Sequence, residues 1–412
     1  MFISKKAFRT KPRNHNLEIN IYNGIFYAVA INLVNPYFAK FAERLGASDY
    51  ELAFLNSWPA FVSIFALIPG ALLIEGFGNK KKSTTFIMFA HKLFYLALAT
   101  VPFINQISKP WLFVFLVGLM NFPGSVYLMG YQTCIGDLFS PRERSHAMGL
   151  RNRYSDLFRL AITLIAGQLL TRIPQNNQEV IFLYQIFFLI AFVFGILEVI
   201  TFNRFKLHID RNQKILSTRA SLKEAFAFVF HDREFKIFLM CSLTFYFGWQ
   251  MGWPLFNIYL IKTLGANEAW LSAVSIASGL SSILTSTLWA KFADKYGNTL
   301  TIAIATFGMS ITPILYAMSS SLWMLVVFNV IIGISIAGTI LVLFNMLLEV
   351  TPDQNRTTII SIYNTFIAIS ATIAPIIGVA IKDMTHIKTA LIIVGCLRLL
   401  GSFTFYLRKR FA

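Results

Sequence analysis

The sequence carries little charge. Asp, Glu, Lys and Arg make up only 13% of its 412 residues, whereas 56% are hydrophobic and the mean hydropathy is +0.62. A soluble domain has about 25% charged residues. So few charges cannot cover a surface that faces water. The composition therefore excludes a soluble globular protein and makes lipid the expected solvent of this chain.

Cysteine and reactive clusters are also scarce. The three cysteines, Cys134, Cys241 and Cys396, lie inside apolar runs, and we expect them to be buried, reduced thiols. No sequence resembles a nucleotide-binding loop. An intramembrane enzyme would need clustered His or paired acids at one depth, and none is evident. We therefore expect no disulfide framework, no metal, no cofactor and no enzyme.

Long apolar runs are what the chain has instead, and about 20 apolar residues suffice to cross a bilayer core. We predict an all-α integral membrane protein with twelve transmembrane helices. The predicted spans are 19–41, 49–73, 83–104, 110–137, 146–171, 179–203, 235–262, 269–291, 299–317, 321–348, 357–381 and 388–407.

Basic residues account for the net charge of +17. Most Lys and Arg fall in segments that are cytoplasmic if the N-terminus is cytoplasmic, and this bias sets membrane orientation. We therefore expect a multi-pass protein of the plasma (inner) membrane with both termini in the cytoplasm. The basic residues 1–18 lead directly into a full span, which predicts a retained first helix. Nucleic acid has no separate support as a partner.

The chain repeats itself at a distance of about 219 residues. Residues 75–79 (Glu-Gly-Phe-Gly-Asn) resemble residues 294–298 (Asp-Lys-Tyr-Gly-Asn), and Leu-Gly-Ala at 45–47 returns at 264–266. Other matches have slightly smaller offsets. Asn35-Pro36 matches Trp253-Pro254, and Asp137, Arg144 and Asn152 match Glu349, Arg356 and Asn364. Such duplication indicates two pseudo-symmetric six-helix halves.

The predicted domains follow from this repeat. Residues 1–203 form the first six-helix bundle, residues 204–234 a cytoplasmic linker, and residues 235–412 the second bundle. Ser221 and Glu224 fit a capping box, which predicts a short amphipathic linker helix near 221–231. No other loop is long enough to hold a separate domain.

The repeated loop also carries a resemblance. The chain is similar over its whole length to bacterial-type transporters of the major facilitator superfamily, whose loop signature reads Gly-x-x-x-Asp-Arg-x-Gly-Arg-Arg after the second span and, in weaker form, after the eighth. The matching segments here are 71–81 and 290–298. Both begin with Ala instead of Gly, and the first has Glu75 for Asp and Gly76 for Arg. The resemblance implies two six-helix halves that give alternating access to a central site.

A conformational switch is the role that the resemblance implies for this loop. Gly78 and Gly297 can adopt the positive φ of a tight turn, and Glu75 and Asp294 can interact with a helix N-terminus. The alternative is that both acids only cap local turns. Arg144 and Arg356, at equivalent cytoplasmic ends with Asp137 and Glu349, either form pairs between the halves or lie in solvated loops.

The strongest candidate for a substrate-binding residue is Arg159, halfway along the fifth span. Asp156 precedes it by three residues, a spacing that lets the two side chains pair. Charged groups inside a membrane default to functional hypotheses. Arg159 then presents a cation to the solute, or Asp156 carries a coupling proton. The alternative is a pair that satisfies only itself and fixes the helix.

A second candidate is the seventh span, where aromatic and amide side chains follow one helical face. These residues are Tyr246, Trp249, Gln250, Trp253 and Asn257. Asn32 and Asn35 of the first span match the positions of Gln250 and Trp253, and Asn121 of the fourth span is a further candidate. Rings and amides suit an amphipathic or aromatic solute. The alternative is packing or an interfacial aromatic belt.

Three further charges, Lys92, Glu198 and Arg398, lie inside spans that the resemblance places on the outside of the bundle. We expect structural pairing or snorkelling for them, and packing for His91. The sequence as a whole predicts a monomeric secondary transporter of a small solute, with proton-coupled efflux of amphipathic compounds as the first hypothesis. Uptake or export of an anionic metabolite, and a transporter-like receptor or scaffold that moves nothing, remain open alternatives.

Overall fold

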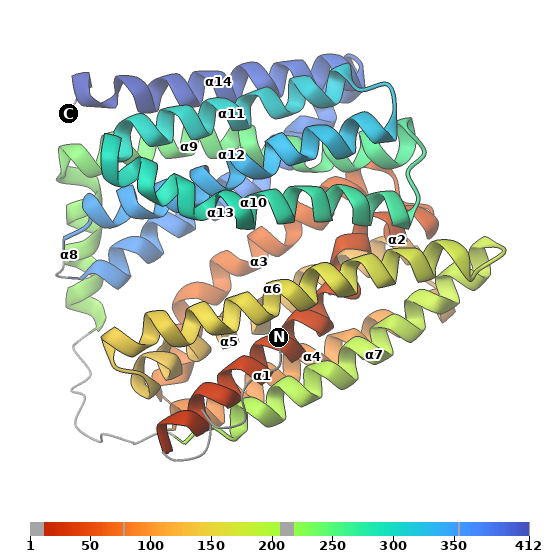
Figure 1. Cartoon of the computed structure of the whole chain (residues 1–412), viewed down its shortest axis with the longest axis horizontal. Coiled ribbons are helices and arrows are strands. Elements are labelled where there is room, and N and C mark those ends of the chain that lie inside the picture. Colours follow the sequence, from red (N-terminus) through yellow and green to blue (C-terminus); the bar gives the residue numbers. More distant parts are fainter. Residues whose placement is uncertain (1–11, 77–78, 207–217, 353–354, 412) are drawn as a thin grey trace. The chain divides into compact units, whose positions relative to one another are not determined.

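A computed structural model describes residues 12–76, 79–206, 218–352 and 355–411, and every regular element in them is helical (Figure 1). The first half contains α1 (Pro12–Asn32), η2 (Asn35–Tyr37), α2 (Phe38–Arg44), α3 (Asp49–Gly76), α4 (Lys80–Thr100), η3 (Val101–Phe103), α5 (Lys109–Leu138), α6 (Pro141–Arg172) and α7 (Asn177–Asn203). The remaining elements are α8 (Thr218–His231), α9 (Arg233–Ile258), the π-helical η4 (Tyr259–Thr263), α10 (Glu268–Tyr296), α11 (Asn298–Met318), α12 (Leu322–Glu349), α13 (Arg356–Met384) and α14 (Ile387–Phe411).

Nine helical segments within the described residues are long and apolar enough to cross a membrane. The first runs through α1, η2 and α2, and the others are α4, α5, α7 and α10 to α14. Three further helices, α3, α6 and α9, have 28, 32 and 26 residues and occupy the other predicted spans. The fold is therefore that of an all-α membrane protein.

The chain divides into two compact units. Unit 1 comprises Met1–Phe38, Phe65–Ile107 and Leu119–Gln213, and unit 2 comprises Ala39–Ile64, Ser108–Gly118 and Lys214–Ala412. Unit 2 thus includes segments from the start of α3 and α5 as well as the whole region after the linker.

Unit 1 is built around α1, which packs against α6 and α7, while α4 also packs against α7 (Figure 1). Its apolar core includes Tyr127, Cys134 and Phe202, all buried. Gly24 lets α1 approach α6 closely, because a Cβ atom at this position would lie 2.5 Å from Cγ of Arg151.

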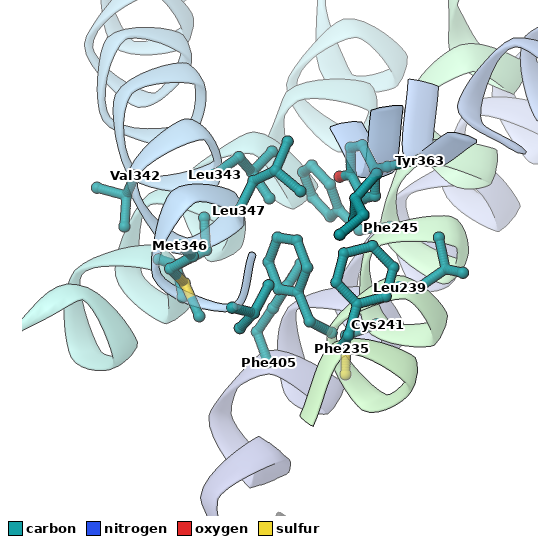
Figure 2. Packing of buried hydrophobic residues seen from close by; sticks show 14 of the residues in the cluster. Phe235, Leu239, Cys241, Phe245, Val342, Leu343, Met346, Leu347, Tyr363 and Phe405 are labelled. Atoms are coloured by element: carbon teal, nitrogen blue, oxygen red, sulfur yellow. The ribbon is translucent and has the colours of Figure 1, made fainter. Parts of the chain in front are cut away.

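Unit 2 is centred on α9, which packs against α13 and α14, and α11 packs against α12 and α14. Figure 2 shows the apolar cluster that joins them. Phe235 and Phe245 of α9 contribute to it together with Met346 of α12, Tyr363 of α13 and Phe405 of α14. Close packing of large side chains from four helices fixes the position of α9 in this unit.

The repeat seen in the sequence also appears in backbone conformation. Gly46 and Gly265 occupy equivalent positions 219 residues apart, and both have positive φ, at 97° and 68°. Gly297 has φ of 81° between α10 and α11, the conformation expected for the turn. The residues that cap the next helices also correspond: Ser48 exchanges hydrogen bonds with Glu51, and Asn267 accepts one from the backbone N–H of Trp270.

Two local expectations are corrected. Helix α8 begins at Thr218, so Ser221 lies inside the helix and is not its N-cap. Cys134 and Cys241 are buried, but Cys396 is exposed. Ile392, Leu400 and Phe403 are exposed near it on α14. An exposed face that carries such apolar side chains suits lipid, so a thiol in an apolar span need not be buried in protein.

Candidate functional site

Helix α6 presents the predicted charged pair. Nε of Arg159 donates to Oδ1 of Asp156 at 3.1 Å, and the two side chains are 32% and 40% exposed. The i, i+3 spacing thus brings them together as expected. Because both side chains keep exposed surface, neither is sealed from a solute or from water.

The aromatic residues of α9 are partly exposed. The rings of Tyr246 and Trp249 stack with centroids 5.4 Å apart and an interplanar angle of 18°, and both residues and Trp253 are half-buried. Tyr246 and Trp249 also pack against the apolar cluster of Figure 2. The cluster supports one side of the stacked rings, and their exposed parts can contact an apolar solute.

Gln250, by contrast, is engaged by α13. Its side chain is buried, its Nε2 donates to the carbonyl oxygen of Ile367 at 3.2 Å, and its Oε1 accepts from Oγ of Ser370 at 2.7 Å. A buried amide needs such partners. Among the predicted residues of α9, Gln250 therefore joins two helices, whereas the aromatic rings keep accessible surface.

The three predicted asparagines lie in unit 1. Nδ2 of Asn32 donates to the carbonyl oxygen of Ala28 within the same helix at 2.8 Å. Asn35 begins η2 and is exposed, and Asn121 lies half-buried in α5 near Pro123. These positions leave their proposed substrate contacts as predictions.

Two of the predicted switch residues, Arg144 and Arg356, form local contacts. Nη2 of Arg144 donates to the carbonyl oxygen of Gly136 at 2.9 Å, and Nη2 of Arg356 donates to that of Thr351 at 3.3 Å. Each arginine thus contacts a carbonyl near the C-terminal end of the preceding helix, where a cation is favoured. Asp294 is exposed; Gly78 lies outside the described residues, as does the side chain of Glu75.

The neighbouring acids show the same relation between the repeats. Asp137 lies 3.8 Å from Nζ of Lys80, and Glu349 accepts a hydrogen bond from Nδ2 of Asn298 at 2.5 Å. In both cases the acid at the end of a long helix, α5 or α12, contacts the start of another helix, α4 or α11. The repeat therefore preserves a contact as well as a sequence.

Sequence reasoning missed a group of ion pairs in unit 2, here called the carboxylate clasp: Arg44, Asp49, Lys262, Glu268 and Lys382. Asp49 lies 2.6 Å from Nζ of Lys262 and also contacts Lys382. Arg44 binds both oxygens of Glu268, at 2.5 and 2.9 Å, and the Glu268 side chain is fully buried.

The clasp is reciprocal with respect to the repeat. Asp49 and Glu268 are 219 residues apart and are the first residues of α3 and α10. Each contacts a cation that lies in the opposite half of the sequence, near the end of the preceding long helical segment there: Lys262 for Asp49, and Arg44 for Glu268. Two-fold relations produce such exchanged contacts. Two sequence signals could have identified these ion pairs: the 219-residue offset between the two acids, and the position of each acid three residues after Gly46 or Gly265.

Unit 1 also buries an ion pair. Nζ of Lys92 lies 2.7 Å from Oε2 of Glu198, and the two side chains are 1% and 2% exposed. The sequence predicted either structural pairing or snorkelling for these residues, and the structure shows pairing. Arg398 of unit 2 is fully buried, and its guanidinium donates to three backbone carbonyl oxygens. Snorkelling is therefore excluded for Arg398 in favour of internal bonding.

Comparison with known proteins gives a consistent match. The family model described as Major Facilitator Superfamily matches residues 22–251 and 238–411. The chain is 22% identical to the "Uncharacterized MFS-type transporter YuxJ" of Bacillus subtilis (strain 168), over 76% of this chain and 78% of that protein. It is 23% identical to the "Multi-drug resistance efflux pump PmrA" of Streptococcus pneumoniae, over 89% of both chains.

Solved structures show the same fold. The nucleoside transporter NupG has a TM-score of 0.71 at 13% identity, covering 96% of this chain and 99% of that one. A D-xylose-proton symporter has a TM-score of 0.71 at 15% identity, covering 96% of each chain. At such low identity the likeness concerns architecture alone.

Proposed function

Since the chain belongs to the Major Facilitator Superfamily, and is thus a multi-pass membrane transporter, we propose that it exports amphipathic aromatic compounds across the plasma membrane in exchange for protons. The two halves, residues 1–203 and 235–412, alternate access to a central site, and both termini are cytoplasmic. The monomer is the transporting unit.

The stacked Tyr246 and Trp249 carry this proposal. Half-buried rings offer a flat apolar surface that binds solutes of varied shape, because stacking and apolar burial need no fixed hydrogen-bond pattern. The relation to a multidrug efflux pump at 23% identity over 89% of the chain supports the same solute class.

The carboxylate clasp supports alternating access. Its two reciprocal sets of ion pairs, Asp49 with Lys262 and Arg44 with Glu268, each join a residue of the first half to one of the second. Ion pairs that form in one conformation and separate in another bias the equilibrium between them. With cytoplasmic termini, this clasp closes the external side.

Ethidium, an aromatic cation, is the probe for this proposal. Proteoliposomes that contain the purified chain should move ethidium when a pH gradient is imposed. Trp249→Ala should weaken this transport about tenfold, because one ring of the stack is lost. Trp323→Ala removes a ring that is 70% exposed and serves as the matched control. Saturable ethidium binding without gradient-driven movement would instead identify a receptor.

Arg159 favours a second candidate function, transport of an anionic metabolite. Its guanidinium retains exposed surface despite the bond to Asp156, and an exposed guanidinium binds carboxylates or phosphates well. Under this alternative, Arg159→Ala abolishes transport of an anionic solute and leaves the yield of folded protein intact. Normal transport by the variant assigns Arg159 a structural role.

A further inference from the structure

The buried Lys92–Glu198 pair lies within a larger polar cluster of unit 1. Nζ of Lys92 is 5.1 Å from the ring centroid of Tyr127 and 6.0 Å from that of Tyr27. The guanidinium of Arg151 is 5.6 Å from the same Tyr27 ring. Tyr27 and Arg151 are half-buried, so they connect the sealed pair to the accessible surface of the unit.

Glu198 is the only acid of this polar cluster among the described residues. The other titratable groups of the cluster come from four helices and are Tyr27 of α1, His91, Lys92 and Tyr95 of α4, Tyr127 and Tyr131 of α5, and Arg151 of α6. With Lys92 and Arg151 both cationic, the cluster depends on a single carboxylate for compensation.

The cluster also has polar atoms without partners. Among the described residues, Oδ1 of Asn23, Nδ1 of His91 and Oγ of Ser155 are buried and form no hydrogen bond. Oε2 of Glu198 likewise makes no aligned hydrogen bond, although Lys92 is within ion-pair distance. Buried polar atoms are normally satisfied. The carboxylate oxygen of Glu198 can receive a proton, and the other unsatisfied polar atoms can bind the water that delivers it.

Glycines on neighbouring helices make space for the basic side chains. A Cβ at Gly195 would lie 2.8 Å from Cδ of Lys92, and one at Gly24 would lie 2.5 Å from Cγ of Arg151. At Gly124 the corresponding distance to Cδ2 of His91 is 3.1 Å. A glycine on each of three helices thus leaves room for one basic side chain, so the backbone is shaped to accommodate these groups.

We propose that the Glu198 carboxylate, held by Lys92, binds and releases the proton that drives transport. A proton transferred from hydronium adds to one carboxylate oxygen and leaves water; release reverses this step. When Glu198 is protonated, Lys92 becomes a buried cation without a counter-ion, which is unfavourable in a membrane. A conformation that hydrates Lys92 or separates α4 from α7 relieves this cost, so proton binding favours that conformation.

This inference rests on the proposed proton-coupled transport and assigns the proton to a different residue than sequence reasoning did. Asp156, the predicted coupling residue, is 40% exposed and pairs within its own helix. Its protonation leaves Arg159 partly exposed and not as a buried cation without a counter-ion. Protonation of Glu198, which is 2% exposed and joins two helices, has a larger effect on the packing of the unit.

Infrared difference spectroscopy of the purified chain tests proton binding without any solute. When the sample is acidified, a carbonyl band of a protonated carboxylic acid should appear in the wild type that is absent from Glu198→Gln. Glu43→Gln is the matched control, since Glu43 forms a partly exposed pair with Lys40 at 3.0 Å. A spectrum of Glu198→Gln equal to that of the wild type, or loss of the band in Asp156→Asn instead, overturns the proposal.

Two further measurements complete the test. If Glu198→Gln does not fold, the double variant Lys92→Gln and Glu198→Gln, which removes both charges of this buried pair, replaces it. In proteoliposomes, Glu198→Gln should lower gradient-driven ethidium movement about tenfold relative to ethidium exchange without a gradient; equal effects on both overturn the proposal. Absence of ethidium movement in the wild type refutes the proposed export, whereas the infrared result still decides whether Glu198 binds a proton.

Discussion

The α4–α7 contact of unit 1 and the α11–α14 contact of unit 2 bury charge in different ways. These are the third and sixth spans of their halves, so the repeat makes them counterparts. The first encloses a lysine and a glutamate at 2.7 Å. The second encloses Arg398, whose Nε, Nη1 and Nη2 donate to the carbonyl oxygens of Gly248, Met309 and Trp249 at 3.1, 3.0 and 2.9 Å.

The difference separates a titratable contact from a fixed one. An arginine remains charged in proteins and can only donate hydrogen bonds. Arg398 therefore holds α9 and α11 in place at any physiological pH. The pair in unit 1 includes a carboxylate that can accept a proton and thereby release its partner. Equivalent helices thus support a static role in one half and a proton-responsive role in the other.

Removal of Glu198 is expected to have the largest effect. Glu198→Ala leaves Lys92 as an unpaired buried cation, which should lower the free energy of unfolding by about 3–5 kcal/mol. Thermal unfolding of the purified variant measures this loss. Glu43→Ala, which breaks the partly exposed pair with Lys40, should cost at most about 1 kcal/mol. Similar losses in both variants would show that the buried pair has no special role.

Replacement of Arg398 should cost less. In Arg398→Met the carbonyl oxygens of Gly248 and Trp249 retain partners within α9, whereas that of Met309 loses its donor, because Pro313 four residues later in α11 has no N–H. We expect a loss of about 1.5–3 kcal/mol from the charge-assisted bonds. Arg398→Lys keeps the charge but not the three-way geometry and should fall between wild type and Arg398→Met. A loss for Arg398→Met as large as that for Glu198→Ala would contradict the contrast between the two contacts.

The sequence predicted the fold well because the relevant signals are repeated and local. Composition required lipid, and the Leu-Gly-Ala segments repeated at an offset of 219 residues prove to have the same positive φ at Gly46 and Gly265. The Asp156–Arg159 pair was also predictable, since both residues lie on one helix. The start of α8 was wrong because a capping box is a short pattern that also occurs within helices.

Contacts between distant helices were not predictable in the same way. Lys92 and Glu198 are more than a hundred residues apart and appeared as isolated charges, so neither could be assigned its partner from the sequence. Gly195, one turn before Glu198, indicates that Lys92 packs against α7, but this meaning is clear only once the structure is known. Gln250 looked like part of a solute-facing stripe, because periodicity does not show that α13 engages its amide.

Two glycine substitutions sharpen the comparison at smaller cost. A Cβ at Gly252 would lie 2.6 Å from Nη2 of Arg398, which three hydrogen bonds hold in place, so Gly252→Ala should cost about 1–3 kcal/mol. At Gly195 the obstacle is the flexible chain of Lys92, and Gly195→Ala should lose about 1 kcal/mol or less. Gly149→Ala, where a Cβ meets nothing within 4 Å, should be neutral or stabilising. Thermal unfolding of the three variants tests this order.

The carboxylate clasp differs from these two buried contacts, because here both halves of the sequence contribute an equivalent acid that pairs with a cation of the other half. Asp49→Asn weakens partly exposed ion pairs, worth about 1 kcal/mol, and should shift the conformational equilibrium roughly fivefold toward the externally open state. Glu268→Gln removes the charge of a fully buried carboxylate and should shift the equilibrium at least as far. Ala266, which is buried, reports this opening when it is replaced by Cys in a Cys396→Ser background. Its labelling by a membrane-impermeant maleimide should accelerate in each variant.

The combined variant discriminates further. If the two sets of pairs act independently, their effects multiply to about 25-fold or more, whereas a single cooperative clasp gives the full acceleration with either change alone. Glu43→Gln, on α2 but outside the clasp, should label at the wild-type rate. An unchanged labelling rate in Asp49→Asn with Glu268→Gln would show that these ion pairs do not hold the external side closed, since an equilibrium that they bias must move when both are removed.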